Sequence, residues 1–280
     1  MTFSKLTEAP SYYNDLEKKD TATILKEINQ EDQKVAYAVQ RALPSINDLI
    51  NQIIPLIRQG GRIFYVGAGT SGRIGILDAS EIPPTFGTDP NLFIGIIAGG
   101  QKAISQAVEY AEDELNTGWN ELCNYQINSK DTVIGLSASG TTPFVVDTLK
   151  KAHETGILTA CITSNPDAPI SQVSKITIET IVGPEYITGS SRMKSGTAQK
   201  MVLNMISSTL MIRMGRVEGN KMVHMKLTNH KLQQRAINML TELLDISPKL
   251  ANELLKKHKT VKTVLKLYHH GNSPSDKETF

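Results

Sequence analysis

The amino-acid sequence predicts an α/β protein built on a doubly wound parallel sheet. Short β-rich runs alternate with helical patterns through the middle of the chain, and two of these runs lead into loops of small and hydroxyl residues that open helices. A strand that is followed by a crossover helix returns to the sheet in parallel, so we expect helices on both faces of the sheet.

The N-terminal residues 1–45 are predicted to form an irregular arm followed by helices. From Thr21 to Arg58 the apolar spacing is helical, and Pro44 interrupts it. One face of the helix after this break carries five isoleucines, namely Ile46, Ile50, Ile53, Ile54 and Ile57. Gly60 and Gly61 are expected to end it.

Residues 46–225 are predicted to form the sheet domain. The candidate strands are Ile63–Val66, Leu92–Ile97, Thr132–Leu136, Leu158–Thr163 and Lys175–Thr180. The candidate helices are Arg73–Ser80, Ala103–Leu115, Pro143–Glu154 and Ser195–Val217. Because crossovers are right-handed, the strand-to-helix loops share one edge of the sheet, where such folds bind their ligands.

Residues 226–280 are predicted to form a small helical subdomain. An amphipathic segment around Leu240 is followed by short helices over Pro248–Lys257 and Thr260–Tyr268, and residues 271–280 are expected to fray. Pro248–Phe280 holds seven lysines and three acidic residues, which is typical of a solvated surface, with a binding patch as the alternative.

Composition excludes several classes of function. Lys plus Arg number 30 and Asp plus Glu 28, a net charge of +2 that gives no general attraction to nucleic acid or anionic lipid. The N-terminus lacks the apolar core of a signal peptide, and no apolar run is long enough to span a bilayer. We therefore expect a cytoplasmic protein with neither a nucleic-acid nor a membrane partner.

Two loops indicate a phosphorylated small molecule as the ligand. The first, from Gly67 to Arg73, reads Gly-Ala-Gly-Thr-Ser-Gly-Arg, and the second, from Ser137 to Thr142, reads Ser-Ala-Ser-Gly-Thr-Thr. Small residues let the backbone approach a ligand, N–H groups at a helix start attract anions, and hydroxyls add donors. Tight turns with helix caps are the alternative.

A nucleotide is a poorer candidate for these loops. The first loop matches G-x-G-x-x-G, but the next strand runs into Ala98-Gly99-Gly100 without the acidic residue that a dinucleotide ribose requires. The Gly-Lys-Ser/Thr of a P-loop is absent. The six histidines show no metal-ligand spacing, so we expect no metal.

Charged residues near the predicted loops are candidates for the chemistry. Glu81 comes just before Pro83-Pro84, which should end its helix, and Glu112 follows the second strand. Either could be an acid–base group or a solvated charge. The Gly/Ser-rich segment 183–200 carries Glu185, Arg192 and Lys194. Its cations could neutralise a phosphate or a carboxylate, unless the segment is a flexible cap.

Five segments carry a resemblance to a known family: VGAGTSGRIGILDASEIPPTFG (66–87), IAGG (97–100), AEDE (111–114), SASGTTPFV (137–145) and GPEYITGSSRMKSGTAQK (183–200). With these the sequence is similar to the N-acetylmuramic acid 6-phosphate etherases of the sugar isomerase (SIS) domain superfamily. The last segment is also shared with the glucokinase regulatory protein.

The resemblance implies a SIS-type, flavodoxin-like fold and a homodimeric carbon–oxygen lyase that needs no metal or redox cofactor. Such an enzyme cleaves the D-lactyl ether of N-acetylmuramic acid 6-phosphate by elimination and hydration, giving N-acetylglucosamine 6-phosphate and D-lactate in cell-wall sugar salvage. The alternative is a non-catalytic sugar-phosphate-binding regulator of the glucokinase regulatory protein type, which is longer and carries two SIS domains.

The same resemblance assigns the acid–base roles to Glu81 and Glu112. The phosphosugar-binding hydroxyls map to Ser71, Ser137, Ser139 and Thr142, beside Gly69 and Thr70 of the first loop. Glu185 and Lys194 are further candidates for contact with the sugar, Glu185 for ring opening and Lys194, or alternatively Arg192, for the lactyl carboxylate.

Overall fold

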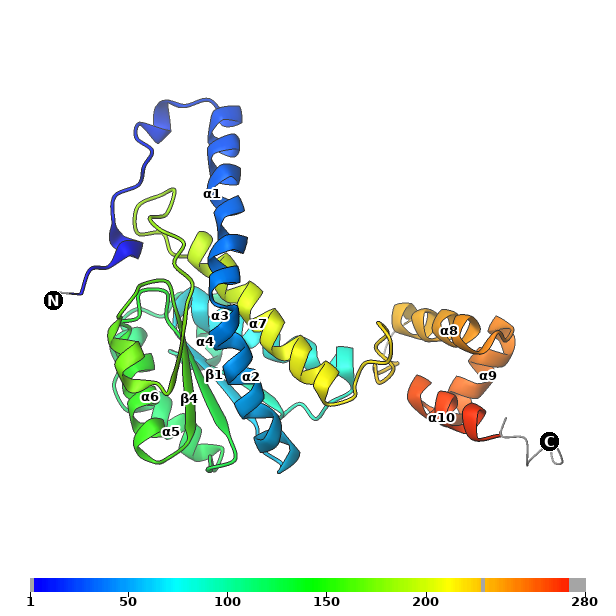
Figure 1. The fold of residues 1–280 in the computed structure, drawn as a ribbon. Coiled ribbons are helices and arrows are strands. Elements are labelled where there is room, and N and C mark those ends of the chain that lie inside the picture. The colour runs from blue at the N-terminus through cyan, green and yellow to red at the C-terminus, as the bar shows by residue number, and fades with distance from the viewer. Residues whose placement is uncertain (1–2, 228–229, 272–280) are drawn as a thin grey trace. The chain divides into compact units, whose positions relative to one another are not determined.

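The computed structural model describes residues 3–227 and 230–271, and the chain divides into two compact units (Figure 1). The first unit comprises Met1–Ser80 and Asn91–Thr209, and the second comprises Glu81–Pro90 and Leu210–Phe280. Of the three boundaries, two fall within the long helices α3 (Gly69–Phe86) and α7 (Lys194–Arg213), and the third lies in the turn before the strand that begins at Phe93.

A five-stranded parallel sheet forms the centre of the first unit. Its strands are β1 (Ile63–Gly67), β2 (Phe93–Ile97), β3 (Thr132–Leu136), β4 (Leu158–Thr163) and β5 (Ile176–Glu179). They lie in the order β2-β1-β3-β4-β5, which confirms the predicted doubly wound sheet. β1, β3 and β4 are buried along their whole length, as expected for central strands covered on both faces.

Helices cover the two faces of this sheet. On one face, Phe64 and Val66 of β1 pack in a cluster with Leu122 of α5 (Thr117–Asn124) and Leu149 of α6 (Pro143–Glu154). On the other face, α3 lies so close that a methyl group at Gly75 would come within 3.0 Å of Tyr65 and of Leu136. Figure 1 shows α5 and α6 together on one side of the strands.

The N-terminal residues form the expected arm and helices. The N-terminal arm (residues 3–20) contains two short 3₁₀ turns, η1 (Leu6–Glu8) and η2 (Leu16–Lys18), and is followed by α1 (Thr21–Arg41) and α2 (Leu43–Arg58). The carboxylate of Asp20 caps α1 by accepting a hydrogen bond from the Thr23 N–H. Pro44 lies in the first turn of α2, where a missing N–H costs little.

The predicted helix over Ala103–Leu115 is wrong. The structure has a short α4 (Gly100–Ser105), a 3₁₀ turn η3 (Ala111–Asp113), and then α5, which the sequence pattern did not indicate. The guanidinium of Arg73 donates hydrogen bonds to the carbonyls of Ile104 and Gln106 at the end of α4. These carbonyls are thus taken by a side chain from another helix, and the backbone turns away.

The expectation that Pro83-Pro84 ends a helix is also wrong. α3 continues through both prolines to Phe86, and the Gly87 N–H still bonds to the Pro83 carbonyl. A proline inside a helix loses its own N–H bond and crowds the carbonyl four residues before it, but its fixed φ is a helical value, and both prolines lie in the last turn of α3. The second proline of the pair is bonded within the second unit, where the Lys226 N–H donates to the Pro84 carbonyl.

The second unit contains the three predicted C-terminal helices, α8 (His230–Leu244), α9 (Pro248–His258) and α10 (Val261–Gly271). Their apolar faces meet around Leu240, Leu255 and Val264. The hydroxyl of Ser247 caps α9 by accepting from the Leu250 N–H. The predicted fraying of residues 271–280 falls almost wholly outside the described residues. Among the helices that the structure describes, none has the length and apolar character needed to cross a membrane.

Candidate active site

The two glycine- and hydroxyl-rich loops lie side by side at the carboxyl edge of the sheet. β1 pairs with β3 in a register that places Gly67 opposite Leu136, the last residue of each strand. The strand order reverses direction between these two strands, and ligands of doubly wound sheets bind beyond such a switch point. The predicted ligand edge therefore contains both loops.

The first loop turns directly into the N-terminus of α3. Gly67 and Gly72 approach so closely that a Cβ on Gly67 would lie 2.7 Å from the Gly72 nitrogen, so neither position tolerates a side chain without a shift. Gly69, Thr70 and Ser71 form the first turn of α3, and none of the three is buried. The first N–H groups of a helix have no intrahelical acceptor and are available to an anion.

The second loop holds its hydroxyls in a hydrogen-bonded group. The Ser137 Oγ lies 2.9 Å from the Thr142 Oγ1 and accepts from the Gly140 N–H. The Ser139 Oγ accepts from the N–H and the hydroxyl of Thr141. Gly140 has a φ of +70° and packs against Ala168, so a side chain there is excluded both by conformation and by space. The hydroxyls are thus positioned before any ligand arrives.

The segment from Gly183 to Lys194 is not a flexible cap. Glu185 is 1% exposed, and its carboxylate accepts hydrogen bonds from the N–H groups of Lys194 and Ser195 and from the Ser195 hydroxyl. A buried carboxylate in this place satisfies and charge-balances the N-terminus of α7. A methyl group at Gly196 would lie 3.4 Å from the Thr70 Cγ2, so the first turn of α7 borders the first loop.

Lys194 is also engaged within the protein. It is 1% exposed, and its Nζ forms an ion pair with the Glu31 Oε2 of α1 at 2.6 Å. Burial raises the pKa of Glu31, but hydrogen bonds from Lys194, Lys34 and Tyr13 outweigh burial and lower it. Both Glu185 and Lys194 therefore use their charged groups to hold α1, the segment and α7 together.

Glu112 shares a hollow with the first loop. This hollow, of about 170 Å³, is lined by Gly69 and Arg73 of α3, by Tyr110 and by Glu112. Glu112 is exposed in the turn η3, next to Tyr110, which holds a left-handed φ of +61°. Arg73 was missed as a lining residue, although its place in the loop motif was the signal that could have found it.

Glu81 belongs to the other unit. It is exposed on α3, twelve residues after Gly69 in the sequence. The division of the chain assigns Glu81 to the second unit and Glu112 to the first, so the structure does not bring these two carboxylates together within one unit.

One buried carboxyl on α3 was not expected. Asp78 is 4% exposed, and it accepts hydrogen bonds from the Tyr65 hydroxyl and from the Ser207 hydroxyl of α7. Burial raises its pKa, while the two hydroxyl donors and the charge of Lys200 act in the opposite direction. Asp78 joins β1, α3 and α7 behind the first loop.

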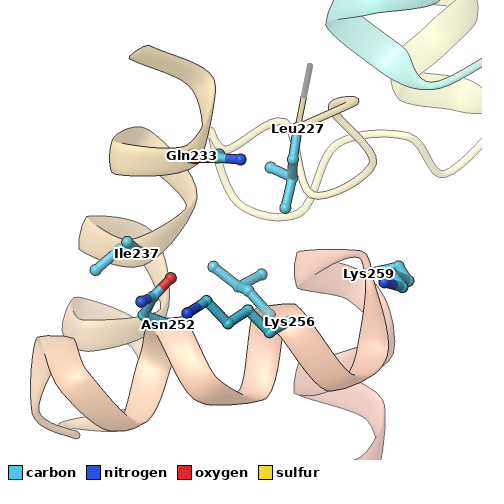
Figure 2. A pocket seen from close by; sticks show the side chains of 7 residues that line it. Leu227, Gln233, Ile237, Asn252, Lys256 and Lys259 are labelled. Carbon is cyan, nitrogen blue, oxygen red and sulfur yellow. The ribbon is translucent and has the colours of Figure 1, made fainter. Parts of the chain in front are cut away.

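A second hollow lies in the C-terminal helices (Figure 2). Figure 2 shows Gln233 and Ile237 on α8 and Asn252 and Lys256 on α9 among the residues that line it, and its volume is about 280 Å³. None of the site residues that the sequence predicted lines this hollow. Among the described residues, no group of three His, Cys, Asp or Glu side chains is arranged to hold a metal ion.

The chain matches two family models, the glucokinase regulatory protein N-terminal SIS domain over residues 45–153 and the SIS domain over residues 114–208. It is 58% identical to an N-acetylmuramic acid 6-phosphate etherase of Bacteroides thetaiotaomicron, over 98% of this chain and 99% of that protein. It is 57% identical to one of Porphyromonas gingivalis, over 93% and 95%, respectively.

Solved structures resemble the fold. A phosphoheptose isomerase from Francisella tularensis aligns with a TM-score of 0.50 and 11% identity, over 70% of this chain and 100% of that chain. A protein of Escherichia coli CFT073, solved in complex with a ligand, aligns with a TM-score of 0.50 and 17% identity, over 72% and 97%. At these identities the likeness extends to the fold.

Proposed function

The chain belongs to the N-acetylmuramic acid 6-phosphate etherase family, and on this premise we propose how its residues cleave the lactyl ether of that sugar phosphate. The observation that carries the activity is 58% identity to an etherase over 98% of this chain. The chain is therefore an enzyme, a carbon–oxygen lyase. The regulator alternative is not favoured, because relatives that are 57–58% identical over 93–98% of this chain are etherases.

The two loops are proposed to bind the 6-phosphate of the substrate. The first turn of α3 offers backbone N–H groups, and the second loop offers hydroxyls that are already oriented by one another. The proposed contacts are Gly69, Thr70, Ser71, Ser137, Ser139 and Thr142. A phosphate held at one end of the sugar positions the reacting carbons at a distance from it.

The proposed reaction is elimination followed by hydration. An alkyl ether is a poor electrophile, but in the open-chain sugar the C1 aldehyde acidifies the proton on C2. Removal of that proton forms a C2–C3 double bond while the C3–O bond breaks and D-lactate leaves with a proton. Water then adds its oxygen to C3 and a proton returns to C2, which gives N-acetylglucosamine 6-phosphate.

We assign the proton transfers to the two glutamates. Glu81 acts as the acid that protonates the departing lactate oxygen, and Glu112 acts as the second acid–base group, at C2. For hydration the roles reverse, since Glu81 is then a carboxylate that can take a proton from water. Each transfer contributes about 10²–10⁴-fold to the rate. Both side chains are exposed in the single chain, so a drier environment must come from substrate or from a second copy.

We propose that the working form is a homodimer in which Glu81 and Glu112 reach one sugar from different copies. The support is that Glu112 shares a hollow with the loop residue Gly69 in the first unit, whereas Glu81 of the same chain is grouped with the second unit. Direct contact of Glu185 or Lys194 with the sugar stays a prediction, since their charged groups have partners inside the protein. A cytoplasmic location in amino-sugar salvage completes the proposal.

Mixing two inactive variants tests the shared site. Glu81→Gln and Glu112→Gln homodimers should each be inactive. An equimolar mixture should recover about a quarter of wild-type activity, because about half of its dimers are mixed and one of the two sites in each receives both glutamates. No recovery under conditions in which mass spectrometry shows subunit exchange would mean that both residues come from one copy.

Incubation with N-acetylmuramic acid 6-phosphate tests the activity itself. The wild-type protein should release D-lactate and N-acetylglucosamine 6-phosphate in equal amounts, measured with a D-lactate dehydrogenase assay. Binding of the sugar phosphate by calorimetry without any lactate would instead support the regulator.

A further inference from the structure

Asn165 lies directly behind the second loop. It follows β4 by two residues, it is fully buried, and β4 is the neighbour of β3 in the sheet. Its side-chain Nδ2 lies 3.3 Å from the carbonyl oxygen of Ala138 and 2.9 Å from that of Ser139. The amide of Asn165 thus contacts two consecutive carbonyls of the second loop, and the Ala138 carbonyl also accepts from the Ser164 N–H and the Thr163 hydroxyl.

The other side of the same amide holds the N-terminal arm. The Asn165 Oδ1 accepts from the Thr7 N–H at 3.1 Å, and its Nδ2 is 3.0 Å from the Thr7 Oγ1. Thr7 is 1% exposed, although it lies in a segment with only short 3₁₀ turns. The two hydrogens of Nδ2 are shared among three acceptors, so every polar atom of the amide is used.

Further along, the N-terminal arm bonds to the segment that follows β5. The Ser11 N–H donates to the Thr188 Oγ1, and the Ser11 hydroxyl donates to the Tyr186 carbonyl. At its start, Phe3 packs against the apolar cluster of the sheet. The arm therefore touches the segments that follow β4 and β5, and through Asn165 the loop that follows β3.

We propose that Asn165, itself held by Thr7, is a positioning residue that fixes the second loop in its phosphate-binding conformation, so that the N-terminal arm takes part in substrate recognition. This inference rests on the proposed binding of the 6-phosphate by that loop. Asn165 is buried and acts through the backbone: orienting the Ala138 and Ser139 carbonyls sets the direction in which the Ser139 hydroxyl and the following N–H groups point.

Steady-state kinetics of Asn165→Asp separates positioning from simple stability. Asp keeps the shape and the acceptor for Thr7 but replaces two N–H donors with an oxygen that faces two carbonyls. The KM for N-acetylmuramic acid 6-phosphate and the inhibition constant of N-acetylglucosamine 6-phosphate should both rise at least about tenfold, with kcat changed by less than about threefold. Asn120→Asp, on the exposed surface of α5, should change neither constant.

A matched pair at Thr7 keeps the inference testable if Asn165→Asp does not fold. Thr7→Val removes the hydroxyl at nearly constant shape, whereas Thr7→Ser retains it. Thr7→Val should raise KM severalfold and Thr7→Ser should leave it close to wild type. A core variant far from the loop, Ile53→Val of α2, should lower the melting temperature without changing KM.

The outcomes distinguish this inference from the proposed function. Unchanged KM in Asn165→Asp and Thr7→Val, in a protein that releases D-lactate, would overturn the positioning role alone. A change in KM that merely follows the melting temperature, with Ile53→Val affecting KM equally, would also overturn it. A wild-type protein that releases no D-lactate would instead contradict the activity.

Discussion

The carboxyl edge of the sheet in the first unit and the helical core of the second unit (α8, α9 and α10) are built from different kinds of contact. In the first, side-chain hydrogen bonds gather at the carboxyl edge of the sheet, where the second loop, Asn165 and Glu185 are all bonded to other segments. In the second, α8, α9 and α10 meet through apolar side chains such as Leu240 and Leu255. Directional polar contacts fix atomic positions, whereas apolar packing mainly supplies stability.

This difference indicates how substitutions should act. Substitutions at the carboxyl edge of the sheet should alter substrate binding or turnover more than stability. Substitutions in the apolar core of α8, α9 and α10 should alter stability more than binding or turnover. Glu81 lies at the border of this division, because it is on α3 but is grouped with the second unit. The residues that follow it bond to that unit, through Pro84 with Lys226 and Gly87 with Arg216.

The largest expected effect is at Glu112. Glu112→Gln removes the proposed proton-transfer group without changing the shape of the side chain, so kcat should fall by about 10²–10⁴-fold while the melting temperature stays unchanged. Asp113→Asn is the matched control, since Asp113 is exposed in the same 3₁₀ turn. Turnover and melting temperature are measured on the same preparations. Equal losses in both variants would show that the turn, and not Glu112, carries the effect.

The helical core should show the opposite behaviour. Leu240 is fully buried in α8, and Leu240→Ala should destabilise the second unit by about 2–5 kcal/mol through lost burial and a residual cavity. Denaturant unfolding followed by circular dichroism measures the loss. The KM for the sugar phosphate should stay within about twofold of wild type at a temperature where the protein is folded. A tenfold rise in KM would contradict the expectation that the core of the second unit affects stability and not substrate binding.

The smallest effect is a pH dependence at Asp78. Because burial raises its folded-state pKa above the ordinary value of 3.8, the folded state favours the neutral acid. The corresponding stability is present below about pH 3.8 and is lost as the pH rises through the folded-state pKa. Asp78→Asn is neutral throughout, so its melting temperature relative to wild type should increase from pH 4 to pH 8. A constant difference across this range would contradict the assignment.

Local patterns predicted much of this fold. Five apolar runs bounded by turn residues correspond to all five strands, and Pro143–Glu154 was predicted with the bounds that α6 has. These strands and this helix could be predicted because their formation depends on residues that are close to one another in the sequence. The errors arose where a distant group decides the structure, as when Arg73 takes the carbonyls at the end of α4.

In the candidate site, the sequence identifies residue types but not the distant partners that hold them. Loops and carboxylates stand out as residue types at strand ends, but the bond between Thr7 and Asn165 joins residues 158 positions apart, and no local pattern encodes it. The buried ion pair of Lys194 with Glu31 has the same character. From the sequence, Lys194 was a candidate to bind a ligand anion, but in the structure its charged group is paired with Glu31.

The central claim is that two carboxyl groups cleave the C3–O bond by elimination and then hydrate the double bond. Reaction of N-acetylmuramic acid 6-phosphate in H₂¹⁸O, followed by mass spectrometry of both products, tests it most directly. The account predicts one ¹⁸O at C3 of N-acetylglucosamine 6-phosphate and none in the D-lactate. Label in the lactate hydroxyl, with an unlabelled sugar, would contradict it.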